Sequence, residues 1–162
     1  FELHFSVAHL NWYRTNPEDY VAKMKGTDKD LAAHLTIIYH RGQVLYGKAI
    51  REVFAEVSRD AYMDSIWCDI EGAVEDILDS PMYIILNLCR VLGYKEDGLI
   101  LSKKEGGEWM LRQLTEKDHG TLTGDFSGLI AAALKEYATG LKMEFQETLA
   151  QQFAEYMLER IK

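Results

Sequence analysis

The stretch that decides the fold is DSPMYIILNLCRVLGYKEDG, residues 79–98. It opens on the Asp-Ser-Pro pattern of a capped helix start, in which proline takes the first helical position. Residues 82–95 are then nearly all apolar, and Asn87 and Arg90 are the polar exceptions before the final Lys95. A helix that is apolar on every side is buried among other elements. The sequence therefore predicts the most buried helix of the chain here, and this helix ends at Gly98.

Apolar side chains at helical spacing predict further helices before this one. Ser58 is the predicted N-cap of a single helix that ends at Asp79-Ser80-Pro81. Its apolar face is formed by Tyr62, Ile66, Ile70, Val74 and Ile77. Nearer the start, the predicted segments are residues 7–25 in two pieces broken at Asn16-Pro17, a helix ending at Gly42, and a short helix around residues 50–54.

Three more helices are predicted after the buried one. Ser102 and Glu105 have the spacing of a capping box, in which each side chain accepts a hydrogen bond from the backbone N–H of the other residue. Residues 116–124 are polar and rich in glycine, which predicts a loop. The last two helices are expected over about 125–138 and 141–161, separated by a glycine C-cap. Five or six consecutive main helices with short connections predict an all-α, up-and-down bundle.

The first six residues have a different pattern. Phe1, Leu3 and Phe5 alternate with polar side chains, which is typical of a half-buried strand. One strand cannot satisfy its own backbone groups or bury a face alone. We expect it either to pad the bundle or to belong to a sheet in missing sequence. On this division, residues 1–26 are a strand and connecting helices at a domain junction, and residues 27–162 are the helical domain.

Composition narrows the classes of partner. The chain has 162 residues, enough for one domain with its own core, and a net charge of −8. Nucleic-acid binders collect Lys and Arg on one face, and no basic run occurs here, so a nucleic-acid partner is not expected. No apolar stretch reaches the ~20 residues of a membrane span and no leader is recognisable, so we expect a cytoplasmic protein without a membrane partner.

Motifs for metal binding or covalent catalysis do not occur in the sequence. His34 and His40 are six residues apart, which is not the spacing of a helical ligand pair. Cys68 and Cys89 lie in apolar runs and are expected to be buried free thiols. The pair Gly106-Gly107 lies within a helical pattern and is expected to allow close helix packing. The sequence predicts no metal site in this chain.

Arg90 is the most informative charged residue, because its neighbours in the sequence are apolar. A buried guanidinium is costly unless it is paired, so we expect either an internal salt bridge or an anionic ligand. Lys103 opens the next helix, and the two cations would converge on a phosphate if the helices are antiparallel neighbours.

A group of carboxylates lies at the end of the preceding helix, at Glu75, Asp76 and Asp79. Carboxylates at a helix C-terminus oppose the helix dipole. The group therefore indicates either a cationic ligand or simply an exposed helix end.

Two alternative functions follow from the residues alone. Arg112 and His119 match the R-x4–6-H spacing of HEPN-type ribonucleases, although the acidic charge disfavours an RNA partner. The other alternative is a non-catalytic helical interaction module, in which the motifs serve core packing only.

Several motifs follow one another in an order that points to a family. Leu45-Tyr46-Gly47-Lys48 forms an LYG-type turn before a short helix. The run from Leu86 to Arg90 is followed by Gly98, Ile100, Ser102-Lys103 and Glu108-Trp109, with Tyr137 later in the bundle. In order and spacing these residues resemble the C-terminal helical domain of aminoglycoside adenylyltransferases. The opening Glu2-Leu3-His4-Phe5 resembles the edge strand of that family's nucleotidyltransferase sheet.

The resemblance implies an enzyme of antibiotic resistance that transfers AMP from ATP to a hydroxyl of an aminoglycoside. In that family an N-terminal α/β nucleotidyltransferase domain binds Mg²⁺ and ATP through a GS motif and a DxD pair, which these residues lack. We therefore expect the helical substrate-binding portion of a longer enzyme, whose missing N-terminal domain is its partner. This chain alone is expected to be inactive and to hold neither ATP nor Mg²⁺.

The resemblance also implies roles for individual residues. Arg90 and Lys103 would contact the phosphates of ATP, and Tyr137 would lie near the nucleotide. On the acceptor side, Asp76 would face the ammonium groups of a cationic substrate. A second acid of the family aligns with Ser80, next to Asp79, and the family's drug-facing tryptophan aligns with Ala8, one helical turn before Trp12. The expected substrate-binding residues are Asp76, Asp79 and Trp12.

Overall fold

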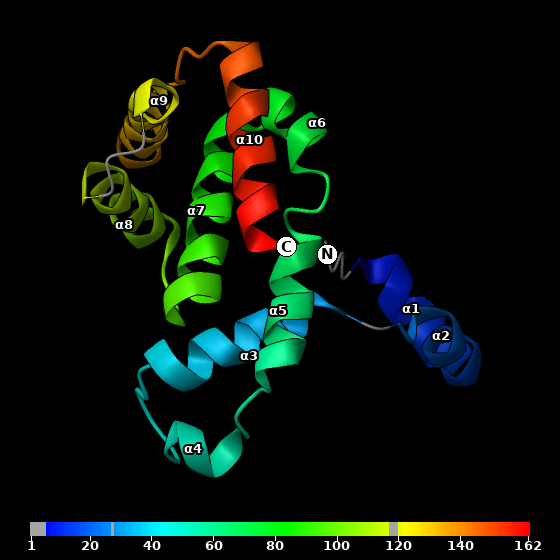
Figure 1. Ribbon diagram of the computed structural model, residues 1–162. Helices are drawn as coiled ribbons and strands as arrows, with labels where there is room; N and C mark the ends of the chain where they lie inside the picture. Colours follow the sequence, from blue (N-terminus) through cyan, green and yellow to red (C-terminus); the bar gives the residue numbers. More distant parts are fainter. Residues whose placement is uncertain (1–5, 27, 117–119) are drawn as a thin grey trace.

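The computed structural model describes residues 6–26, 28–116 and 120–162, and of residues 116 and 120–125 the backbone alone. The described residues form helices and no strand, which confirms the all-α prediction (Figure 1). The helices are α1 Val7–Thr15, α2 Pro17–Met24, α3 Asp30–Arg41, α4 Ile50–Val53, α5 Arg59–Cys68, α6 Ala73–Asp79, α7 Pro81–Asp97, α8 Lys103–Glu116, α9 Gly120–Thr139 and α10 Glu147–Ile161. The strand predicted over residues 1–6 falls almost entirely outside the described residues.

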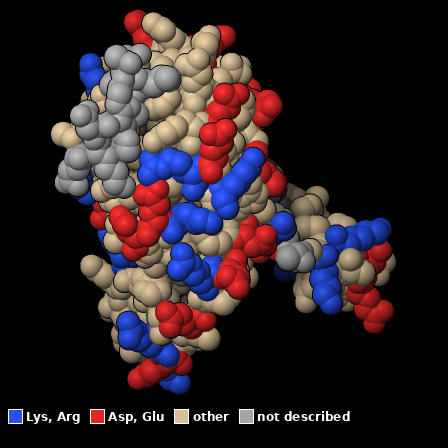
Figure 2. Space-filling model, viewed as in Figure 1, with Lys and Arg blue, Asp and Glu red and all other residues tan. Residues whose placement is uncertain are grey.

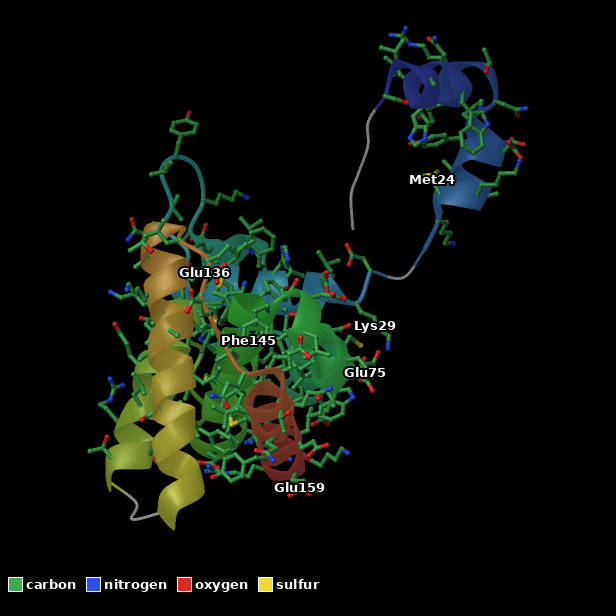
Figure 3. The ribbon with its side chains drawn as sticks, turned by 90° about the horizontal axis from the view of Figure 1, so that it is seen from above. Met24, Lys29, Glu75, Glu136, Phe145 and Glu159 are labelled. Atoms are coloured by element: carbon green, nitrogen blue, oxygen red, sulfur yellow. The ribbon has the colours of Figure 1, made fainter. Side chains whose placement is uncertain are left out.

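The helices α1 and α2 form a hairpin that lies apart from the other helices (Figures 1 and 3). Their predicted break is confirmed, since Pro17 occupies the first turn of α2. Trp12 joins the two helices: its ring packs edge-on against Tyr20, with the ring centroids 5.0 Å apart. The indole Nε1 of Trp12 also donates a hydrogen bond to Asp19 Oδ2 at 3.0 Å. The hairpin is therefore held together by its own side chains.

The single helix predicted from Ser58 to Asp79 is wrong in its middle, because a turn at residues 69–72 separates α5 from α6, whereas its predicted end is confirmed. Gly72 precedes α6, and a Cβ at this position would lie 2.9 Å from Asp76 Oδ2. Ile70 is nevertheless fully buried in this turn. The apolar stripe thus continues across the turn, and this continuity explains why the spacing alone predicted an unbroken helix. The N-cap predicted at Ser58 is confirmed.

The helix α7 lies between its neighbours in the bundle, and α8, α9, α10 and α6 all pack against it (Figure 1). Its buried residues are Ile84, Ile85, Leu86, Asn87, Leu88, Cys89, Val91, Leu92 and Gly93. The predicted start at Pro81 and the predicted stop are both confirmed, since Gly98 has a left-handed φ of 67°. A helix with this many buried residues on several sides forms the centre of the core.

The helix α8 lies against α7 and begins with the predicted capping box. Ser102 Oγ accepts from the backbone N–H of Glu105 at 3.2 Å, and the backbone N–H of Ser102 donates to Glu105 Oε2 at 2.8 Å. Gly106 brings the two helices together, because a Cβ added there would lie 2.8 Å from the backbone nitrogen of Arg90. The expected packing role of the Gly106-Gly107 pair is confirmed.

The helices α9 and α10 differ from the prediction at their ends. Since α9 begins at Gly120, most of the loop predicted over residues 116–124 is wrong, and residues 117–119 lie outside the described residues. Gly140 ends α9 with a φ of 73°, as predicted. The final helix does not start at residue 141, since residues 140–146 are not helical. Glu136 Oε2 accepts a hydrogen bond from the backbone N–H of Met143 at 2.9 Å. This bond gives a backbone donor of the non-helical segment a partner that a helix would otherwise supply.

Among the described helices, none is both long enough and apolar enough to cross a membrane. Figure 2 shows one face of the molecule, on which acidic side chains flank a group of basic ones over the middle of the bundle. The surface thus carries charges of both signs despite the net charge of −8.

Candidate anion-binding pocket

The three residues expected to contact a nucleotide line one pocket of about 390 Å³. The α7–α8 connection supplies much of its wall, and α3 and α9 contribute from the sides. The lining residues are Ile37, Arg41, Arg90, Ile100, Leu101, Ser102, Lys103, Glu105 and Tyr137. Its volume lies within the range of about 300–1,000 Å³ that is usual for small-molecule sites. The structure therefore brings Arg90, Lys103 and Tyr137 together from three helices.

Arg90 is held in place by Asp69, which lies in the turn between α5 and α6. The two side chains form a salt bridge of 3.3 Å between Nη2 and Oδ2 and are 15% and 25% exposed. Burial raises the pKa of the Asp69 carboxyl, and the neighbouring Arg90 guanidinium opposes this rise. Arg90 Nε is buried without a hydrogen-bond partner in the described part of the chain. Both expectations for Arg90 remain open, because the internal salt bridge leaves donor capacity for an anion.

Lys103 adds a second positive charge at the start of α8. Its Nζ lies 4.4 Å from the ring centroid of Tyr83, a cation–π distance. Burial and the nearby Arg90 guanidinium lower the pKa of the Lys103 ammonium, and Asp69 partly opposes this effect. Two cations that repel each other across a partly buried pocket are stabilised by an anion between them. Both cations line the same pocket, as expected, but α8 crosses α7 at a steep angle and is not its antiparallel neighbour (Figures 1 and 3).

A third cation, Arg41, comes from the last turn of α3. Its Nη1 donates to the carbonyl oxygen of Ile100 at 3.1 Å, and its Nη2 pairs with Glu105 Oε1 at 2.6 Å. The backbone N–H of Ser102 and then the Arg41 guanidinium lower the pKa of the Glu105 carboxyl to about 2. The pocket therefore has three cations, Arg41, Arg90 and Lys103, and one carboxylate among its lining residues.

The other side of the pocket is apolar or aromatic. Ile37 on α3 and Tyr137 on α9 both line it, and they are 38% and 47% exposed. A half-exposed aromatic ring can stack against a planar ligand group, and aliphatic side chains can cover its other face. The pocket thus combines a charged part with a part that suits a flat ring, as a nucleotide requires.

The residues expected to bind a cationic substrate lie elsewhere. Asp76 and Asp79 are exposed on α6 and do not line the pocket. Trp12 lies in the α1–α2 hairpin, which Figure 1 shows apart from α6, with its indole engaged by Asp19. Within residues 6–162 as described, the structure does not bring Trp12 beside these two carboxylates.

Reasoning from the sequence missed two pocket residues, Arg41 and Glu105 as its charge partner, and also Asp69, which pairs with Arg90 from outside the lining. Arg41 and Asp69 had no local signal, because their partners lie 64 and 21 residues away in the chain. The spacing of Glu105 from Ser102 indicated helix capping, but it gave no indication of the ion pair between Glu105 and Arg41.

A metal centre finds no support among the residues that the structure describes, which contain no group of three or more His, Cys, Asp or Glu side chains able to hold an ion. His40 Nε2 lies 3.7 Å from Glu56 Oε1 instead. Cys89 is a buried free thiol, as expected, whereas Cys68 is only partly buried. The ribonuclease pair stays a prediction, since Arg112 is exposed on α8 and His119 lies outside the described residues.

Comparison with known proteins identifies the family of the chain. No curated protein matches the chain. The family model described as "Aminoglycoside adenylyltransferase, C-terminal domain" matches residues 52–160, more than half of the chain. The match covers the turn with Asp69, the whole of α7 and α8, and the part of α9 that carries Tyr137. The chain therefore belongs to the family of aminoglycoside adenylyltransferase C-terminal domains.

Proposed function

We propose that this domain binds the nucleotide and the acceptor in an enzyme that transfers AMP from ATP to a hydroxyl of an aminoglycoside. In such a transfer the hydroxyl gives its proton to a catalytic carboxylate of the partner domain, and its oxygen attacks the α-phosphorus. The bond from that phosphorus to the oxygen bridging to the β-phosphate breaks, and pyrophosphate leaves. The proposal assigns Mg²⁺ and the catalytic carboxylates to a partner nucleotidyltransferase domain. It places the reaction in the cytoplasm, as an antibiotic-resistance function.

The observation that carries the proposal is the shared pocket of Arg90, Lys103 and Tyr137. Arginine and lysine are the side chains that bind phosphate oxygens, and a bidentate guanidinium adds geometric specificity. The unpaired Nε of Arg90 supports this role, since a buried donor without a partner is costly. An interaction module would need neither the converging cations nor the cavity between them.

For the acceptor, the proposal uses Asp76 and Asp79 on α6 and Trp12 on the hairpin. Aminoglycosides carry several ammonium groups, and exposed carboxylates attract such a ligand in a salt-dependent manner. The pairing of Trp12 with Asp19 would orient its ring for contact with a sugar face.

Isothermal titration of ATP into the full-length protein, in which the nucleotidyltransferase domain is joined to this domain, and into its variants tests the nucleotide site. Arg90→Ala and Lys103→Ala should each weaken ATP binding about tenfold, because each removes charge-assisted hydrogen bonds. Lys104→Ala is the matched control, since this adjacent lysine is 64% exposed, pairs with Glu108 and does not line the pocket. It should leave the affinity within about twofold of the parent.

Circular dichroism spectra must show that each variant keeps its helix content. Equal ATP affinity in the parent, Arg90→Ala and Lys103→Ala would refute the nucleotide site. An equal loss in all three variants, Lys104→Ala included, would show only a general effect of charge.

A further inference from the structure

Arg41 is the one cation lining the pocket to which the family resemblance gives no role. It belongs to α3, whereas Arg90 and Lys103 belong to α7 and α8. Its guanidinium reaches across to the carbonyl of Ile100 and to the carboxylate of Glu105, both near the start of α8. Any ligand that Arg41 contacts in this pocket is therefore held between α3 and the α7–α8 pair.

We propose that Arg41 binds the phosphate chain of the nucleotide together with Arg90 and Lys103. To do so, Arg41 breaks its ion pair with Glu105. This inference rests on the nucleotide-binding function proposed above. It makes Arg41 a binding residue of the site and Glu105 its positioning residue in the empty pocket.

The exposure of the pair supports this exchange. The Arg41 and Glu105 side chains are 49% and 38% exposed, so solvent screens their ion pair and it contributes little to stability. A phosphate chain carries more negative charge than one carboxylate and offers several oxygens to the planar guanidinium. Exchanging Glu105 for phosphate is therefore favourable for Arg41. The Arg90–Asp69 pair is more buried, which makes it the fixed part of the site.

Glu105 has two separable functions, and this makes the proposal testable. Its Oε2 accepts from the backbone N–H of Ser102 in the capping box, while its Oε1 holds Arg41. Glutamine also serves at this position of a capping box. Glu105→Gln should therefore keep the first turn of α8 and remove the charge that holds Arg41.

The experiment is isothermal titration of the full-length protein, with its nucleotidyltransferase domain, using two probes, ATP and inorganic tripolyphosphate. Arg41→Ala should weaken the binding of both probes about tenfold, because the lost contact is with phosphate. Arg41→Lys should recover part of the lost affinity, since lysine restores the positive charge but not the planar guanidinium that binds two phosphate oxygens at once. Glu105→Gln should raise the affinity for both probes about threefold, and this gain should disappear when Arg41→Ala is also present.

Arg51→Ala is the matched control, since this arginine lies on the neighbouring α4 against the ring of Tyr39, outside the pocket. It should change neither affinity. If the Arg41–Glu105 salt bridge is purely structural, Glu105→Gln should show no gain in affinity and bind the probes no better than the parent. That result, or unchanged binding in Arg41→Ala, would overturn the inference.

A loss in Arg41→Ala for ATP without a loss for tripolyphosphate would also overturn it, because the contact would then be with the base or ribose. Failure of the underlying function looks different. In that case Arg90→Ala and Lys103→Ala would bind ATP like the parent, whatever the Arg41 variants do.

Discussion

Replacing Gly106 with alanine tests how closely α7 and α8 must approach. The added Cβ would lie 2.8 Å from the backbone nitrogen and from the Cβ of Arg90, and 2.9 Å from its Cα. Carbon atoms in good contact are about 3.5–4.0 Å apart, so the helices would have to separate by about 1 Å. The obstructing atoms belong to the backbone and to its Cβ, which cannot rotate away. Arg90 would move with them.

The magnitude follows from two opposing effects. Overpacking of a core typically costs about 1–3 kcal/mol, and contact with backbone atoms places Gly106→Ala near the upper end of that range. Alanine recovers about 0.8–1 kcal/mol of helix propensity relative to glycine. The net loss of unfolding free energy should be about 2 kcal/mol, equivalent to a fall in Tm of about 4–8 °C for a chain of this size.

Gly128→Ala is the matched control, since this glycine lies within α9 and a Cβ there would meet nothing within 4 Å. Only the gain in propensity applies, so this variant should be stabilised by about 0.5–1 kcal/mol. Urea and thermal unfolding measure both variants. If Gly106→Ala were as stable as Gly128→Ala, the close approach of α7 and α8 would be wrong.

Two further predictions concern charges. Asp76→Asn should weaken the binding of an aminoglycoside several-fold at low salt and less at high salt, because an exposed carboxylate attracts ammonium groups through a screened interaction. Titration at two salt concentrations measures this effect; Glu159→Gln, an exposed site on α10, is the control, and equal affinities for both variants would contradict the acceptor site. Glu105 titrates near pH 2 in the fold, below its ordinary value of 4.5, so its contribution to stability is complete above pH 4.5 and is lost as the pH falls toward 2. At 38% exposure this contribution is at most about 1 kcal/mol. The stability difference between the parent and Glu105→Gln should therefore shrink when urea unfolding is measured at pH 3 instead of pH 7, and a difference independent of pH would refute the assignment.

The parts of the fold that could be predicted from the sequence are those governed by local chemistry. Both ends of α7 follow from Pro81 and Gly98, whose backbone preferences act within one turn. The capping box of α8 is equally local, since its two hydrogen bonds join Ser102 and Glu105. The convergence of Arg90 and Lys103 was predicted for an antiparallel pair of helices, but α8 instead crosses α7 close to Arg90, where Gly106 allows the close approach (Figures 1 and 3).

The parts that could not be predicted depend on distant contacts or on ambiguous spacing. The turn between α5 and α6 keeps Ile70 buried, so the periodicity of apolar side chains is the same with the turn as without it. The position of Asp69 opposite Arg90 is a result of that turn. Arg41 meets Glu105 only because α3 packs near the start of α8, and a pairing between residues so far apart leaves no trace in local spacing.

The place of α10 in the core has a consequence for how the protein is made. This helix lies against both α6 and α7, and it buries Phe153, Met157 and Ile161 among residues that are translated much earlier. While the ribosome is still synthesising residues 120–146, the apolar side of α6 and much of α7 have no permanent cover. Exposed apolar surface of this kind favours aggregation and chaperone binding. The bundle can close only after residue 161 has left the exit tunnel, so we expect α10 to protect the apolar surface of α6 and α7 from these contacts.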